Sequence, residues 1–378
     1  MLPQIRFYVG KGTPSAMSRQ LTTAVESVEI THNDTGASGI QITFQTGRQG
    51  AQDVKDDPIV SDSSLKVFNR VVIQTVAPTG GTVLFDGIIT HHEYAPSNTP
   101  GQSRLTVTGE DASVMMDLEE KTKEHPNQHE GTIATKIIGD YSQYGLTPKV
   151  KNPPTIIVPS AQERVPVQHE TDLQYLRRMA ARYNYHFYIN PGDTLFSPQA
   201  YWGPPVRSGN PQRALSLDLG RFTNVAWITF QYNALAPTKV ADRVQERTSD
   251  KQAPAKQEST TLDTLSKEPG LTSQGSNVRK SFLRAPWGLD NAQTRAQAQA
   301  MVDNSVESVV TASGELDVAA YGDVLKARDL VDLRGVGGSY NGTWYVSSVT
   351  HSIRNGSHIQ RFTLSREGIG GLKEVVRV

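Results

Sequence analysis

Two adjacent histidines in the run THHE, residues 90 to 93, are side chains that could bind a metal ion. The surrounding pattern predicts a β-strand, and neighbouring side chains on a strand point to opposite faces. His91 and His92 therefore cannot easily bind one ion together. His91 and His351 recur at similar places in two strand patterns, so we expect a structural or hydrogen-bonding role for both. We predict no metal site and no cofactor.

Two other patterns could be taken for catalytic or binding sites. The run GVGG, residues 335 to 338, lies between two strand patterns with no helix after it, so a tight β-turn is a better interpretation than a phosphate-binding loop. Five acidic residues could supply the paired carboxylates of a glycosidase, although a solvated acidic domain junction explains them as well: Asp111, Asp117, Glu119, Glu120 and Glu124. No nucleophile or zinc-protease motif supports hydrolysis, and we predict no catalytic residue and no enzymatic activity.

A third group could contact a partner protein. Arg177, Arg178 and Arg182 lie mostly off the apolar stripe of a predicted helix, so they form either a solvated face or ion pairs with a neighbouring subunit. Buried arginine and aromatic side chains commonly anchor interfaces. The predicted interface residues are Arg177, Arg178, Arg182, Trp202, Trp287 and Trp344.

Composition limits the partners and the cell compartment. The chain has 378 residues, enough for roughly two or three domains, and its 38 basic residues equal its 38 acidic ones. A net charge of zero does not favour nucleic acid or an anionic membrane as a partner. There is no cysteine, which excludes disulfides and fits a reducing cytoplasm. The start MLPQIRFYVGKGTPS lacks the apolar core of a signal peptide, no apolar run reaches about 18 residues, and we expect no membrane insertion.

The periodicity of the chain changes twice. Residues 1–115 alternate between polar and apolar types and predict a small antiparallel β-barrel. Residues 116–210 change to a helical period, with one helix over Thr132 to Tyr144. A second helix has Thr171 and Gln174 at the spacing of a capping box, and a strand follows it, so this segment predicts an α/β module.

The last third returns to strand patterns. Residues 211–235 and 278–378 predict a second barrel that carries one helix from a cap at Asp290 to about Ser308. Residues 236–277 lack aromatic side chains and are rich in polar types, which predicts an extended polar loop. The predicted fold class is α+β and β-dominated, with two related small antiparallel barrels flanking the α/β module.

The two barrel patterns contain a repeat. The strand RLTVTGED begins at Arg104, and its near copy RFTLSREG begins at Arg361. Each follows an apolar strand, a glycine-containing turn and a strand with a Thr-His pair, in the same order. A cyclic trimer of chains with duplicated domains presents six similar domains around one axis. Such a chain could therefore join a threefold partner to a sixfold one.

Two stretches of the sequence resemble a known family. The stretch QHETDLQYLRRMAARYNYHFYI, residues 168 to 189, is similar to the E-[ST]-D-x-x-[FY]-L-x-R-[ML]-A helix of the late control protein D family of tailed phages and to the hub part of VgrG proteins. The run GVGGSYNGTWYVSSVTHSI, residues 335 to 353, resembles the last barrel of that family. The order of elements fits over nearly the full length.

The resemblance implies a structural baseplate hub. Such a hub is a homotrimer whose barrels form a ring of pseudo-sixfold symmetry between a hexameric inner-tube or tube-initiator protein and a trimeric spike, among other baseplate proteins. VgrG chains continue into an OB domain and a needle, whereas this sequence ends at Val378, so we expect the spike to be a separate protein. The expected particle is an extracellular contractile injection system or a phage tail, assembled in the bacterial cytoplasm.

Two other functions stay open. One is a tail-associated cell-wall hydrolase, which requires a paired acid and base. The other is a β-rich module that binds carbohydrate or a cell surface, which requires an exposed aromatic platform. Neither accounts for the internal repeat.

Overall fold

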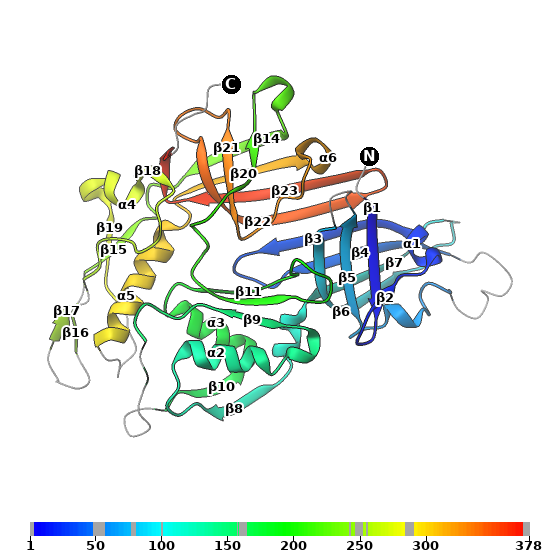
Figure 1. The fold of residues 1–378 in the computed structure, drawn as a ribbon, viewed down its shortest axis with the longest axis horizontal. Helices are drawn as coiled ribbons and strands as arrows, with labels where there is room; N and C mark the ends of the chain where they lie inside the picture. The colour runs from blue at the N-terminus through cyan, green and yellow to red at the C-terminus, as the bar shows by residue number, and fades with distance from the viewer. Residues whose placement is uncertain are drawn as a thin grey trace.

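The fold is α+β and dominated by one large sheet (Figure 1). The computed structural model describes residues 4–47, 57–76, 81–99, 101–156, 158, 165–241, 243–245, 252–254, 256–283 and 291–372. Thirteen strands share the large sheet, and eleven of them follow the order β14-β20-β23-β22-β3-β4-β7-β6-β5-β1-β2. The remaining two, β13 and β21, pair with each other, and β21 also pairs with β22. Two stretches of the chain, here called halves A and B, build this sheet.

Half A comes first in the chain. Its elements are β1 (Gln4–Gly10), β2 (Ser15–Ala16), α1 (Arg19–Ala24), β3 (Val25–Asn33), β4 (Gly39–Thr46), η2 (Ser63–Leu65), β5 (Arg70–Val76), β6 (Val83–Ala95), β7 (Ser103–Asp111) and η3 (Ala112–Met116). In β7, Leu105 and Val107 are buried while Arg104 and Thr106 are half-exposed, which confirms the predicted alternation.

The α/β module follows half A, and the figure shows it on one side of the sheet (Figure 1). Its elements are β8 (Glu120–Glu124), α2 (Glu130–Gly139), η4 (Ser142–Tyr144), β9 (Thr147–Val150), β10 (Val167–Thr171), α3 (Asp172–Ala181), β11 (His186–Asn190) and β12 (Gln199–Gly203). The predicted cap is confirmed, because the Thr171 hydroxyl accepts a hydrogen bond from the Gln174 amide at 3.2 Å. The apolar faces of α2 and α3 pack against β11 and β12 in a separate core.

Half B and the segment inserted into it complete the chain. The elements of half B are β13 (Gln212–Ser216), η5 (Gly220–Phe222), β14 (Val225–Tyr232), α5 (Asn291–Val306), β20 (Val310–Asp317), α6 (Val318–Tyr321), β21 (Leu330–Arg334), β22 (Gly342–Arg354), β23 (Ser357–Arg366) and β24 (Gly368–Gly371). The inserted segment contains β15 (Thr238–Val240), β16 (Arg243–Gln245), β17 (Gln252–Pro254), β18 (Ser266–Pro269), α4 (Gly270–Ser273), η6 (Gly275–Asn277) and β19 (Arg279–Ser281).

The inserted segment differs from the predicted extended loop. Its strand β15 pairs with β19, and β18 pairs with β24 at the end of half B. Val240, Leu265 and Leu271 are buried, so a few apolar residues dock a segment that is polar on average. The predicted helix is present as α5, and its predicted cap, Asp290, lies outside the described residues.

The two halves have the same sequence of strand irregularities. In half A, β3 has a register shift against β4 between Val25 and Ser27. In half B, β14 has the same shift against β20 between Val225 and Trp227. A second shift occurs in β6 between Ile89 and His91. Its counterpart in β22 lies between Val346 and Ser348. Because a β-bulge changes strand direction and twist, two matched bulges indicate that the halves share one fold plan.

A left-handed residue is also repeated. Phe68 has φ 65° and Arg328 has φ 68°, a conformation that costs non-glycine residues energy. The Phe68 amide donates to the Ile89 carbonyl at 2.7 Å. The Arg328 amide donates to the Val346 carbonyl, also at 2.7 Å. Each left-handed residue therefore binds the residue at the start of a bulge: Phe68 binds Ile89 of β6, and Arg328 binds Val346 of β22.

The bulges correct the alignment suggested by the sequence repeat. Counted from the bulges, Val107 is equivalent to Phe362, whereas the two sequence copies place Leu105 opposite Phe362. The structural repeat is thus offset by two residues from the sequence copies. His91 lies one residue after the bulged residue of β6, and His351 lies four residues after the bulged residue of β22. Because side chains alternate between the two faces along a strand, these histidines face opposite sides of the sheet. His91 is exposed and His351 is buried, and the expected common role is wrong.

Candidate functional site: the seam between the two halves

The two halves meet in a continuous ladder, here called the seam. Strand β22 pairs antiparallel with β3 from Ser348 opposite Asn33 to Arg354 opposite Ser27. On one face of the seam, the hydroxyls of Thr31 and Thr350 are 3.3 Å apart. On the other face, Ile30 and His351 are buried opposite each other. One sheet therefore crosses from half A into half B without an edge.

Arg328 ties the seam to the α/β module. Its guanidinium donates five hydrogen bonds, of 2.7 to 2.9 Å, to Asn33 O (two), Ser38 Oγ, Ile189 O and Asn190 Oδ1. The group also lies over the Tyr188 ring, 4.2 Å from its centroid. Five bonds use all five N–H donors of an arginine, which allows it to be buried. This residue therefore fixes half A, half B and the module relative to one another.

Three buried histidines line the seam, and each is held neutral. The Nε2–H group of His32 donates to Leu84 O at 2.8 Å, which leaves Nδ1 to accept from the Ser38 hydroxyl at 3.0 Å. Burial, together with the charge of Arg328, lowers the pKa of His32 to about 3. His351 and His358 share a hydrogen bond of 3.0 Å. Burial lowers the pKa of both rings, to about 4 for His358.

A fourth histidine, His186, links the module to both halves. Its Nδ1 lies 3.8 Å from Asp34 of half A, and its Nε2 lies 3.5 Å from Glu307 of half B. Burial alone would lower the pKa of His186, but hydrogen bonding and attraction from Glu307, together with Asp34, raise it. The imidazole therefore lies between two carboxyl groups from opposite sides of the seam.

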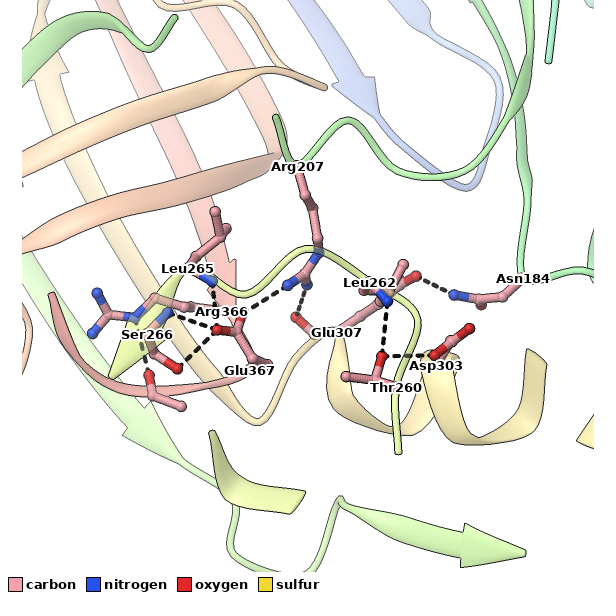
Figure 2. Close-up of polar contacts among 11 residues, drawn as sticks. Asn184, Arg207, Thr260, Leu262, Leu265, Ser266, Asp303, Glu307, Arg366 and Glu367 are labelled. Atoms are coloured by element: carbon pink, nitrogen blue, oxygen red, sulfur yellow. Dashed lines mark hydrogen bonds and ion pairs between the residues drawn. The ribbon is translucent and has the colours of Figure 1, made fainter. Parts of the chain in front are cut away.

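A buried ion pair anchors the inserted segment (Figure 2). Arg207 Nη1 donates to Glu367 Oε2 at 2.7 Å, and both side chains are 2% exposed. The other carboxylate oxygen of Glu367 accepts from the Leu265 amide and from the amide and hydroxyl of Ser266, at 2.6 to 2.8 Å. Earlier in the segment, the hydroxyl of Thr260 donates to Asp303 of α5. Polar bonds from the core therefore position a segment that has little apolar surface.

The structure places the predicted interface arginines on α3 and at its end. Arg178 pairs with Glu170 at 2.6 Å, and Arg182 pairs with Glu130 at 3.2 Å. Both ion pairs lie within the chain and stabilise the module. Arg177 is half-buried. Contact of any of the three with another subunit stays a prediction.

The predicted tryptophan anchors are corrected by their burial. Trp202 and Trp344 are both fully buried. The indole N–H of Trp202 donates to Leu176 O, and that of Trp344 donates to Tyr340 O. Neither side chain can reach a partner, because each completes the core of its own domain. Trp287 lies outside the described residues.

The other motifs have structural roles. Asp111 is buried and accepts from the Ser38 and Ser113 amides, so its carboxylate holds a turn beside the seam. Asp117, Glu119, Glu120 and Glu124 are exposed around β8, as a solvated cluster would be. The glycines at 335 and 337 adopt left-handed φ angles of 80° and 85° in the turn before β22, which confirms the predicted turn.

None of the helices among the described residues is long and apolar enough to cross a membrane. Within the same residues, no group of three or more histidine and acidic side chains has the arrangement of a metal site.

The residues that hold the seam and the inserted segment escaped sequence reasoning. Arg207, Arg328 and Glu367 are single charged residues within ordinary polar or alternating stretches. The signal that could have drawn attention to Glu367 is its position at the end of the repeated strand RFTLSREG.

The fold is similar to that of solved structures of tail proteins. No protein-family model matches the chain, and no curated protein matches it. The tail protein from Neisseria meningitidis MC58 superposes with a TM-score of 0.62 at 13% identity over 97% of both chains. The 43 kDa tail protein of prophage MuSo2 from Shewanella oneidensis gives a TM-score of 0.61 at 11% identity, covering 96% of this chain and 98% of that one.

A third neighbour comes from a secretion system. It is an Escherichia coli protein described as a component of the type VI secretion system with structural similarity to the T4 bacteriophage tail proteins gp27 and gp5. It superposes with a TM-score of 0.55 at 12% identity over 93% of this chain and 77% of its own. At these identities the likeness shows a shared fold, the β-dominated α+β fold of tail proteins.

Proposed function

We propose that this protein is the structural hub of a phage-like contractile injection system or phage tail, without enzymatic activity. Three copies form a ring in which halves A and B alternate. The ring has pseudo-sixfold symmetry and joins a hexameric inner tube to a trimeric spike. Its work is mechanical: it adapts the symmetry and holds the spike.

The observation that carries this proposal is the pair of equivalent halves joined through one seam. The matched bulges and left-handed residues support a duplicated ring segment. The continuous β22–β3 ladder supports direct sheet continuity from one segment to the next. Closed rings need a repeated interface, and cyclic symmetry supplies it without leaving an unpaired edge. The folds of tail proteins and of a type VI secretion component point to the same class of machine.

The proposal is tested by the native mass of the purified protein. We expect a species near three times 41.4 kDa by light scattering, and a stable complex when a trimeric spike protein is added. A protein that is strictly monomeric at all concentrations, and also in the presence of the spike protein, would contradict the hub.

The two alternative functions have weaker support. Asp111 holds two backbone amides and is buried, so it is not available as one of a pair of hydrolytic carboxylates. Tyr188 and Tyr201 stack on each other with ring centroids 4.9 Å apart, but both are buried and so form no platform for a sugar. Release of muropeptides from purified peptidoglycan would revive the hydrolase, and specific retention on a glycan array would revive the binding module.

A further inference from the structure

Two of the strand edges that are unpaired within the described part of the chain lie on β6 and β14. Residues 91–95 of β6 pair with β7 on one side only. Strand β14 pairs with β20 and with no other described strand. Unpaired edges present backbone N–H and C=O groups that another strand can bind.

These two edges are the counterparts of the two strands that form the seam. Counted from the matched bulges, β6 of half A is equivalent to β22 of half B, and β14 of half B is equivalent to β3 of half A. In the seam, β22 and β3 pair antiparallel. The chain therefore contains a complete template for pairing β6 with β14.

We propose that residues 91–95 of β6 pair antiparallel with β14 of a second copy of this chain, in the register that the seam defines. This proposal rests on the ring proposed above and specifies its closing interface. In the seam, Thr350 lies opposite Thr31. Thr350 and Glu93 each lie three residues after the bulge of their strand, so they are equivalent. Thr31 and Gln231 each lie five residues after the bulge of their strand, so they are equivalent too. Glu93 therefore lies opposite Gln231 of the second copy, and Tyr94 lies opposite its Phe230.

The distribution of exposed apolar side chains supports this interface. The described residues include twelve large apolar side chains that are exposed, and six of them lie at the two edges. The edge of half A has Val67, Phe68 and Tyr94, and the edge of half B has Trp227, Tyr232 and Leu235. Ladder pairing would bring the two groups together, and large apolar patches commonly mark interfaces.

Phe68 gives a specific contact in the same arrangement. Its equivalent, Arg328, reaches across the seam to the carbonyl of Asn33 at 2.7 Å. The residue equivalent to Asn33 is Asn233, two positions before the exposed Leu235. Phe68 is 59% exposed and Leu235 is 71% exposed, so contact between copies would bury two of the most exposed apolar side chains. An apolar pair between copies then occupies the place that an arginine and a carbonyl occupy within the chain.

Disulfide cross-linking tests the register, because the natural chain has no cysteine. We expect Glu93→Cys with Gln231→Cys to give bands at two and three times 41.4 kDa on a non-reducing gel after mild oxidation. Thr350→Cys with Thr31→Cys is the positive control and should close within one chain, because those hydroxyls are 3.3 Å apart. Glu93→Cys with Thr229→Cys is the register control on the same strand face, and it should cross-link at least tenfold more slowly.

The outcomes separate this inference from the proposed function. A protein of trimeric mass in which the Glu93 and Gln231 cysteines do not cross-link overturns the interface and leaves the hub proposal standing. Equal rates for the Gln231 and Thr229 pairs overturn the register. A monomer at every concentration, with no cross-link, overturns both proposals.

A variant without cysteine gives an independent measurement. Leu235→Glu places a charge in the proposed contact and should shift the native mass from trimer to monomer while the circular dichroism spectrum stays unchanged. Leu118→Glu is the matched control, since Leu118 is 59% exposed and lies in neither edge segment, between η3 and β8. Loss of the trimer in both variants, or in neither, would overturn the interface.

Discussion

Glu367→Gln and Arg207→Met test whether the buried ion pair anchors the inserted segment. The two charges are 2.7 Å apart, and both side chains are 2% exposed. Glu367 also accepts the amides of Leu265 and Ser266 through its other oxygen. Glutamine keeps one oxygen that can accept from these amides, but its NH₂ group faces the guanidinium. The substitution therefore removes the ion pair while keeping the size of the side chain and its bonds to the two amides.

The expected magnitude follows from these contacts. Removing one partner of a buried ion pair costs about 3–5 kcal/mol, because the other charge is left buried without compensation. We expect each single variant to lose stability in that range. The double variant removes both charges of this pair, so its loss should be smaller than the sum of the single losses by about 2 kcal/mol or more.

Two measurements check this prediction. Urea unfolding of the wild type, the two single variants and the double variant gives the coupling free energy. Hydrogen exchange of the peptide containing Leu265 and Ser266 should accelerate in both single variants, while exchange in α3 stays unchanged. Purely additive losses, or unchanged exchange at residues 265 and 266, would refute the anchoring role of this pair.

The remaining predictions concern the seam and the module. His32 has a pKa of about 3 in the folded chain against an ordinary 6.5, so the unfolded chain binds the proton more tightly and stability falls as the pH drops below about 6.5. The free energy of unfolding should fall by about 2 kcal/mol at pH 5 because of this histidine. Urea unfolding at pH 5 and pH 8 should show a smaller pH dependence in His32→Gln than in the wild type. His91→Gln, which replaces an exposed histidine, is the control. Arg328→Lys keeps the charge but loses the planar fork, so we expect a loss of about 2 kcal/mol in urea unfolding, and no loss would show that the fork is dispensable. Trp202→Phe removes the indole hydrogen bond to Leu176 and leaves a void, which should cost about 1–3 kcal/mol and lower the thermal midpoint; an unchanged midpoint would contradict its role in the core of the module.

Local elements were predictable because their signals are local. The Thr171 cap, the apolar face of α3 and the turn containing Gly335 each depend on residues within a few positions of one another. The order of strands in the two repeats was also visible in the sequence. Its register was not, because bulges next to Ile89 and Val346 shift the pairing without leaving a recognisable residue pattern.

The predicted site residues show the same limit. Trp202 and Trp344 have the right chemistry for an interface, but burial within the chain is decided by packing between distant elements. Arg178 and Arg182 were correctly placed off the apolar stripe, and their partners Glu170 and Glu130 are set by the neighbouring elements of the module. Residue type therefore indicated what a side chain could do, and tertiary contacts determined which role was available.

The sequence by itself determined the β-dominated α+β class, the helical module between two strand-rich segments and the duplication. Alternation, helical periodicity and repetition are properties of the chain that need no partner element. Only the tertiary structure decided that β22 pairs with β3, that Arg328 joins three parts of the molecule and that Glu367 anchors a polar segment. The paired residues of that ladder lie 315 positions apart at one end, from Asn33 to Ser348, and 327 apart at the other, from Ser27 to Arg354. The free energy of such contacts depends on geometry and burial that local sequence does not encode.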